Sequence, residues 1–165
     1  MKLKVDISYK SLNKRNEELC GDHIELLKTE NSTILILADG MGSGVKANIL
    51  STLTAKILGT MLYNGSSLDE CVETIAKTLP ICQTRQVAYS TFTILQIYDS
   101  GETYIVEFDN PGCIFIRDGK LLELPFYDCD FGSYALLAAD SRDAKISSST
   151  YIIWWFCNCI FSAGR

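Results

Sequence analysis

The stretch TILILADGMGSGVKA, residues 33–47, carries most of the information about the fold. An apolar, strand-like run ends on Asp39 and passes at once into a loop that contains three glycines. From Ala47 to Leu62, apolar residues that include Leu53 recur at helical spacing on one face, which predicts a helix of about five turns. The sequence therefore predicts a strand and a helix joined by a glycine-rich loop, with a carboxylate where the strand ends.

Runs that alternate apolar and polar residues predict strands on both sides of this helix. These runs cover residues 5–9, 19–29 and 33–38 before the helix, and 90–97, 102–108, 113–118 and 120–126 after it. Asp118-Gly119 predicts a hairpin between the last two runs, and Asn110-Pro111-Gly112 predicts another turn.

A second helix is predicted directly after the first. Asn64-Gly65 is a typical helix end, Ser67 and Glu70 match a capping box, and apolar residues keep helical spacing up to Pro80. The order of strands, two helices and strands predicts an α+β fold in which helices cover an antiparallel sheet. The chain has 165 residues, of which 47% are hydrophobic, and this is enough material for a single domain with one core.

Composition excludes several classes of function. A formal net charge of −5 without a basic run argues against nucleic-acid binding, because contacts to the phosphate backbone need clustered Lys and Arg. The start, MKLKVDISYK, lacks the continuous apolar stretch of a signal peptide, so we expect a cytoplasmic protein. The seven cysteines are odd in number and lie within apolar segments, which favours buried thiols over a disulfide framework.

The glycine loop fails the two common phosphate-binding patterns. A dinucleotide-binding fingerprint requires a third glycine where this chain has Val45, and a P-loop requires a glycine directly before Lys46, where the chain again has Val45.

The loop instead suits a divalent cation. Carboxylate and carbonyl oxygens are the ligands that hard cations prefer, and Asp39 with the Gly40 carbonyl supplies both types. A second carboxylate, Asp22, lies on the preceding predicted strand and would meet Asp39 if the two strands pair. On this interpretation, Gly40→Val should disturb the carbonyl ligand and leave the helix free to form. The alternative is that Asp39-Gly40 is an ordinary turn, because Asp-Gly is common in turns.

Four segments are distinctive in their order and spacing: CGD at 20–22, ADGMGSGVKAN at 38–48, AYSTFTIL at 88–95 and NPGCIFIRDGKL at 110–121. They resemble the metal-dependent serine/threonine protein phosphatases, in the branch of the bacterial sporulation stage II E type. The resemblance covers residues 1–140 and implies one phosphatase-like domain, a β-sandwich of two antiparallel sheets flanked by helices.

The resemblance also implies a site with two Mn²⁺ or Mg²⁺ ions. Asp39 would bridge both ions, the Gly40 carbonyl would bind one of them, and Asp22 would hold the site directly or through water. Asp140 stands where the family has a further metal ligand. Water between the ions would attack the phosphorus, so Asp22 and Asp39 are the expected catalytic carboxylates.

The sequence departs from the family after residue 140. Ser141 follows Asp140 where the family has glycine, and residues 141–165 match nothing in the family and lack its final metal-binding aspartate. We therefore expect a truncated or frame-disrupted domain that holds two ions, one or none. The apolar run from Tyr151 to Phe161 is shorter than the roughly 20 residues that span a bilayer. We expect it to complete the core, and if exposed, to support a homodimer.

Three further residues are considered for the site. His23 follows Asp22 directly, and because neighbouring side chains of a strand face opposite sides, it should point away from the metals. Lys46, at the start of the helix, and Arg85, before a strand, are weak candidates for binding the substrate phosphate.

Two functions follow from these observations. The first is hydrolysis of phosphoserine or phosphothreonine on a regulatory partner protein, by resemblance one of the anti-anti-sigma type. The second is a phosphatase-like binding module with little or no activity, which keeps the fold and has lost the distal metal ligands. Asp22, Asp39 and Gly40 favour the first, whereas Ser141 and the missing final aspartate favour the second.

Overall fold

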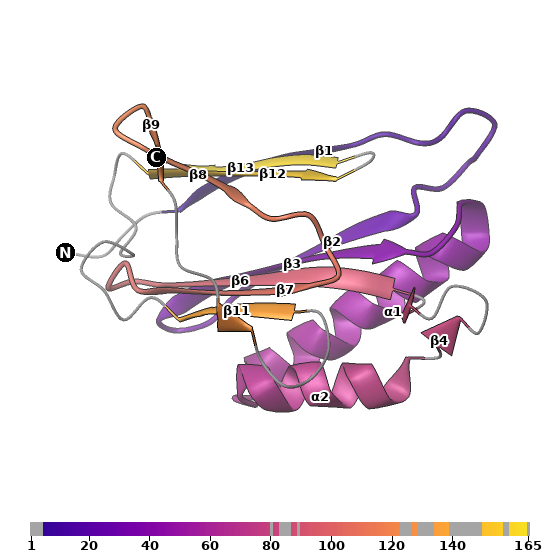
Figure 1. The fold of residues 1–165 in the computed structure, drawn as a ribbon, viewed down its shortest axis with the longest axis horizontal. Helices are drawn as coiled ribbons and strands as arrows, with labels where there is room; N and C mark the ends of the chain where they lie inside the picture. Colours follow the sequence, from indigo (N-terminus) through magenta and orange to yellow (C-terminus); the bar gives the residue numbers. More distant parts are fainter. Residues whose placement is uncertain are drawn as a thin grey trace.

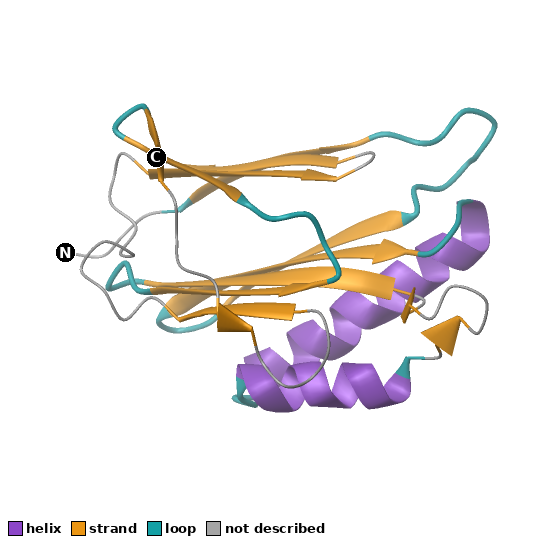
Figure 2. Cartoon of the chain, viewed as in Figure 1, coloured by secondary structure: helices purple, strands orange, loops and turns teal. Residues whose placement is uncertain are grey.

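The computed structural model describes residues 5–79, 81–82, 87–88, 90–122, 127–128, 134–138, 150–156 and 159–164. Within these ranges two antiparallel sheets lie face to face, and two helices cover the outer face of one sheet (Figures 1 and 2). This arrangement confirms the predicted α+β sandwich, with both described helices on the same sheet.

The helix-covered sheet has six described strands. Their order is β10 (Tyr127–Asp128), β11 (Tyr134–Ala138), β7 (Thr103–Phe108), β6 (Ser90–Tyr98), β3 (Ser32–Gly40) and β2 (Asp22–Lys28). The central strands β3 and β6 pair along their whole length, from Ser32 opposite Tyr98 to Gly40 opposite Ser90. Both faces of β3 are covered, which explains why its sequence is almost continuously apolar.

The second sheet joins the two ends of the chain. Its strand order is β1 (Asp6–Ser11), β13 (Cys159–Gly164), β12 (Thr150–Phe156), β8 (Ile114–Arg117) and β9 (Lys120–Leu122). Two further short strands, β4 (Ile81–Cys82) and β5 (Val87–Ala88), pair only with each other. Ile152 of β12 is fully buried between the sheets. Ile152 is the one side chain of the apolar run 151–161 that the structure describes, and its burial agrees with the expectation that the tail completes the core.

Alternation along β3 divides the core into two layers. Leu35 and Leu37 face the second sheet, where they pack with Leu95, Ile105 and Phe115. Ile34, Ile36 and Ala38 face the helices, in a cluster that includes the stacked rings of Phe92 and Phe108. Because successive side chains of a strand alternate, odd-numbered positions of β3 point between the sheets.

The first helix, α1 (Gly44–Tyr63), packs on β2 and β3 through small side chains. Its buried residues include Gly44, Ala47, Ser51, Ala55 and Gly59. The prediction that Leu53 belongs to this buried face is wrong, because Leu53 is 50% exposed. Ala47, Leu58 and Leu62, which were predicted for the same face, are buried, so the helical spacing is right for these positions and wrong at Leu53.

The second helix, α2 (Leu68–Thr78), begins as predicted. Ser67 accepts a hydrogen bond from the Glu70 N–H, and Glu70 accepts one from the Ser67 N–H, which completes the capping box. Neither this helix nor any other in the described ranges combines the length and apolar character needed to cross a membrane.

The predicted turns after β7 have different roles. Asp118 and Gly119 join β8 to β9 with φ values of 51° and 75°, as the tight hairpin requires. The turn at 110–112 instead carries the chain from one sheet to the other, between β7 and β8 (Figure 1).

Candidate metal centre

Strands β2 and β3 bring two carboxylates together. Asp22 and Asp39 are directly opposite each other in the register of these antiparallel strands, where paired Cβ atoms lie about 4.5–5.5 Å apart. Asp39 shares the strand face of Leu35 and Leu37, between the sheets. The pairing of β2 with β3, on which the predicted meeting of the carboxylates depends, is therefore observed.

Burial makes this acid pair unfavourable without a positive charge. Asp22 is 7% exposed, and its Oδ2 atom receives no hydrogen bond from any described residue. The pKa of Asp39 is raised from 3.8 to about 7, first by burial, then by the negative charge of Asp22 and by a hydrogen bond with Asp22. Around neutral pH, a proton or a cation is needed to offset the repulsion between the two groups.

Glycines allow α1 to approach the ends of these strands. A Cβ on Gly40 would lie 1.9 Å from the backbone oxygen of Ala47. The Gly40 N–H donates to the Gly21 carbonyl at 3.1 Å. This hydrogen bond joins the segment Gly21-Asp22 to the segment Asp39-Gly40. The expectation that a side chain at position 40 would leave the helix undisturbed is therefore wrong, since that side chain would collide with the first turns of α1.

The oxygen donors at this point fit Mn²⁺ or Mg²⁺. Two carboxylates and the Gly40 carbonyl are ligands that hard cations prefer, and the Asp22 Oδ2 atom has bonding capacity that no described residue uses. Asp22, Asp39 and Gly40 would hold such an ion. Within the ranges that the structure describes, no group of three or more His, Cys, Asp or Glu side chains could share one ion. A third carboxylate would thus have to come from outside these ranges.

The other residues predicted for the site are Lys46, Asp140 and Arg85. Lys46 lies exposed in the first turn of α1. Asp140 and Arg85 lie outside the described residues.

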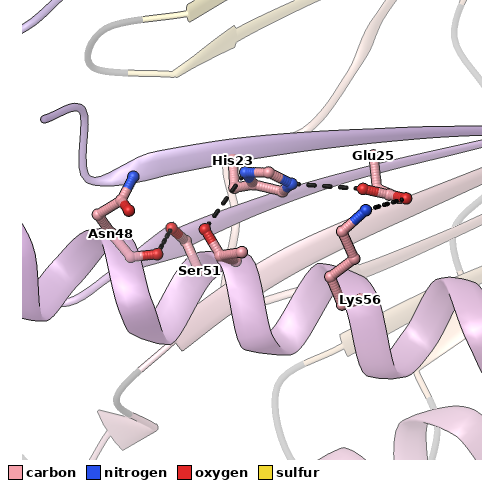
Figure 3. Close-up of polar contacts among 6 residues, drawn as sticks. His23, Glu25, Asn48, Ser51 and Lys56 are labelled. Atoms are coloured by element: carbon pink, nitrogen blue, oxygen red, sulfur yellow. Dashed lines mark hydrogen bonds and ion pairs between the residues drawn. The ribbon is translucent and has the colours of Figure 1, made fainter.

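His23 points away from the acid pair, as predicted, and faces α1. Its Nδ1 atom lies 3.3 Å from the Thr52 hydroxyl and its Nε2 atom 3.4 Å from Glu25, and Glu25 also binds Lys56 at 2.7 Å (Figure 3). Asn48, one helical turn before Thr52, donates to the Cys20 carbonyl at 2.8 Å. These contacts form a polar seam between α1 and β2 on the face opposite Asp22.

The loop before β2 also holds the start of α1, a contact that the sequence did not predict. The Ser43 hydroxyl donates to Glu17 Oε1 at 2.9 Å. Gly44 has a φ of +69°, and a Cβ there would collide with the same carboxylate. A negative charge at the first turn of a helix is favourable, because the free N–H groups there carry partial positive charge.

A second polar group beside Asp39 was also missed from the sequence. Thr91 of β6 is the register partner of Asp39. Its hydroxyl donates to Asn110 Oδ1 at 2.6 Å, and Asn110 Nδ2 donates to the Thr93 hydroxyl at 3.0 Å. The one sequence signal was a pair of threonines that alternates with apolar residues at the start of β6.

The crossover between the sheets is anchored next to this group. Glu107 is 7% exposed and accepts a hydrogen bond from the Cys113 N–H at 2.7 Å. Burial raises the pKa of Glu107, partly offset by this hydrogen bond, and burial with the nearby Glu107 charge raises the pKa of the Cys113 thiol well above 9.0. The Cys113 thiol therefore stays protonated, while the described cysteine that is fully buried, as expected, is Cys71.

Several solved structures share this fold. The phosphatase domain of SpoIIE from Bacillus subtilis, solved with a fragment of its regulatory domain, has a TM-score of 0.75 at 17% identity, over 91% of this chain and 45% of that chain. The RsbU and RsbW domains of a Mycobacterium tuberculosis protein give 0.71 at 17%, over 91% and 42%. RsbX in complex with magnesium gives 0.59 at 19%, over 95% and 71%. The chain thus spans less than half the length of the first two.

A comparison of the sequence with known protein families identifies the family. No curated protein matches it. The family described as Stage II sporulation protein E (SpoIIE) matches residues 29–126, which include β3, both helices and the strands β6 to β9. Since this match covers more than half of the chain, the protein belongs to the SpoIIE family.

Proposed function

We propose that this chain is a metal-dependent phosphatase that hydrolyses phosphoserine or phosphothreonine on a regulatory partner protein. The observation that carries the proposal is the buried pair of Asp22 and Asp39, opposed in register and left with one carboxylate oxygen that no described residue satisfies. The family membership supports the same reaction.

The chain's own groups have distinct parts in this proposal. Asp39, Asp22 and the Gly40 carbonyl would hold Mn²⁺ or Mg²⁺, and Asp140 would contribute to a second ion. Such ions, when bound, activate water at neutral pH and clamp the phosphoryl oxygens. Lys46 and Arg85 are the candidates for orienting the phosphate through their positive charge.

The partner proposed is a phosphorylated regulator of the anti-anti-sigma type. RsbU and RsbW domains occur together in one of the similar structures, and the description of another names the bacterial stressosome. We place the reaction in the cytoplasm, the compartment expected from the sequence. A homodimer through the apolar tail stays a prediction, which the oligomeric state in solution tests.

A second candidate is a binding module with weak or no activity. The absence of a third acidic ligand near the pair, in the part of the chain that the structure describes, favours it. Residues 141–165, which depart from the family pattern, favour it as well.

Hydrolysis of p-nitrophenyl phosphate and of a phosphoserine peptide, with and without Mn²⁺, separates the two candidates. The phosphatase should turn over both substrates only with the metal, and Asp39→Asn should abolish turnover. Asp118→Asn is the matched control, because it makes the same chemical change in the exposed β8–β9 turn. Mn²⁺ binding without hydrolysis by the unmodified chain would establish the binding module instead.

A further inference from the structure

Three oxygen-bearing side chains lie in one row across the helix-covered sheet. Asp22 of β2 is opposite Asp39 of β3, and Asp39 is opposite Thr91 of β6. Direct partners in neighbouring antiparallel strands project from the same face, with Cβ atoms about 4.5–5.5 Å apart. Thr91 therefore borders the acid pair on the side away from Asp22.

The hydroxyl proton of Thr91 is not available to Asp39. Thr91 donates it to Asn110 Oδ1 at 2.6 Å, and a hydroxyl has only one proton to donate. Its oxygen keeps acceptor capacity on the face that it shares with the two carboxylates. Acceptors gathered in this way repel one another unless a proton or a cation lies among them.

Asn110 is itself held in place. Its Nδ2 group donates to the hydroxyl of Thr93 at 3.0 Å, and Thr93 is fully buried. With the amide nitrogen committed to Thr93, the amide oxygen faces Thr91. The turn between β7 and β8 thus determines which way the Thr91 hydroxyl points.

We propose that Thr91 is an additional oxygen donor of the cation site, and that Asn110 is the positioning residue that holds it in that role. The inference rests on the cation site of the proposed function and adds a neutral donor to Asp22, Asp39 and the Gly40 carbonyl. Hydroxyl oxygens of Ser and Thr are known ligands of Mg²⁺ in other proteins.

Calorimetric titration of the whole chain with Mn²⁺ tests the proposal. Thr91→Val should weaken Mn²⁺ affinity about tenfold, the lower end of the effects seen when groups that support a metal site are removed. Thr91→Ser keeps the hydroxyl and should bind close to the unmodified chain. Asn110→Ala should weaken affinity to a similar degree, and combining it with Thr91→Val should add little, because the two residues act as one unit.

Thr103→Val is the matched control. Thr103 is buried in β7 and donates to the Gly101 carbonyl, at the end of the sheet far from Asp39. This variant should lose stability in EDTA and keep its Mn²⁺ affinity.

Two outcomes would overturn the inference. Unchanged Mn²⁺ affinity in folded Thr91→Val would show that the Thr91–Asn110 contact only stabilises the turn, and would leave the phosphatase proposal intact. No Mn²⁺ binding by the unmodified chain would overturn both. Binding that depends on Thr91, in a chain that hydrolyses no phosphate, would uphold the donor and overturn the phosphatase.

Discussion

Asp39 lies where its negative charge costs stability unless it is neutralised. Its pKa is about 7 in the folded chain and 3.8 in the absence of these surroundings. Between these values the folded state holds a proton that the unfolded state has already lost, so the free energy of unfolding must fall as the pH rises from about 4 to 7. Above pH 7 the decrease in the free energy of unfolding is complete.

Asp39→Asn should therefore stabilise the metal-free protein at pH 8 while abolishing Mn²⁺ binding. The gain is expected to be on the order of 1–2 kcal/mol, a value reduced for the partial solvent exposure of Asp39. Denaturant unfolding in EDTA at pH 4 and pH 8 measures it. The difference between variant and unmodified protein should be small at pH 4 and should grow towards pH 8. An equal stability difference at both pH values would contradict the raised pKa, and Asp118→Asn should show no such trend.

Gly40 should tolerate a side chain poorly even as Ala. The added Cβ would meet the backbone of Ala47 at 1.9 Å, and an overpacked contact with backbone has no flexible side chain that can move aside. We expect a loss on the order of 3 kcal/mol. Gly65→Ala is the control, because Gly65 has a φ of +89° with nothing nearby, and only the roughly 1 kcal/mol of backbone strain should apply. Similar urea midpoints for both variants would show that α1 can shift freely.

Residues of the site differ in how far the sequence could predict them. Asp22 and Asp39 were identifiable because each stands in a short Gly-Asp or Asp-Gly step on strands that neighbour each other in the chain. Thr91 and Asn110 were not, because their contact depends on the position of β6 between β3 and β7 and on the path of the turn between the sheets. Hydrogen bonds between side chains on different strands leave no periodic signal.

At the scale of elements, α1 shows that hydrophobic periodicity predicts a buried face only in part. Val45, Ile49 and Leu53 repeat every four residues, yet they are 62%, 58% and 50% exposed. The buried face of the helix combines small residues, among them Ala47 and Ser51, with Leu58 and Leu62. The end of α1 at Asn64-Gly65 and the start of α2 at its capping box were predictable. The start of α1 at Gly44 was not, because Ser43 makes no side-chain cap and the apolar spacing begins only at Ala47.

The polar seam between α1 and β2 should contribute measurably to stability. Asn48→Ala removes the donor to the partly buried Cys20 carbonyl, and we expect a loss of about 1–2 kcal/mol. Asn64→Ala is the control, because Asn64 donates to the Thr60 carbonyl at the exposed end of the same helix, where the loss should be smaller. Thermal unfolding of the two variants compares them. A larger loss for Asn64→Ala would mean that the helix end, and not the seam, holds α1 in place.

At the scale of the whole molecule, the sandwich depends on strands that are far apart in the sequence. β1 pairs with β13 from Asp6 opposite Gly164 to Ser11 opposite Cys159. The sequence pattern predicted β1 and a core-completing tail. It could not predict that they pair, because strand pairing across such a separation is decided by the fold and not by local propensity.

This pairing of the first strand with the last has a kinetic consequence. Closing so long a loop costs conformational entropy before any contact offsets it, so such pairings form late. During synthesis, β1 has to wait for β13, whereas β2, β3, α1 and α2 are neighbours in the chain and can assemble early. Pulse-labelled hydrogen exchange during refolding should therefore protect the amides of Ile36 and Leu37 before the amides of β1 that donate to β13. Simultaneous protection would indicate that the two sheets form in one cooperative step.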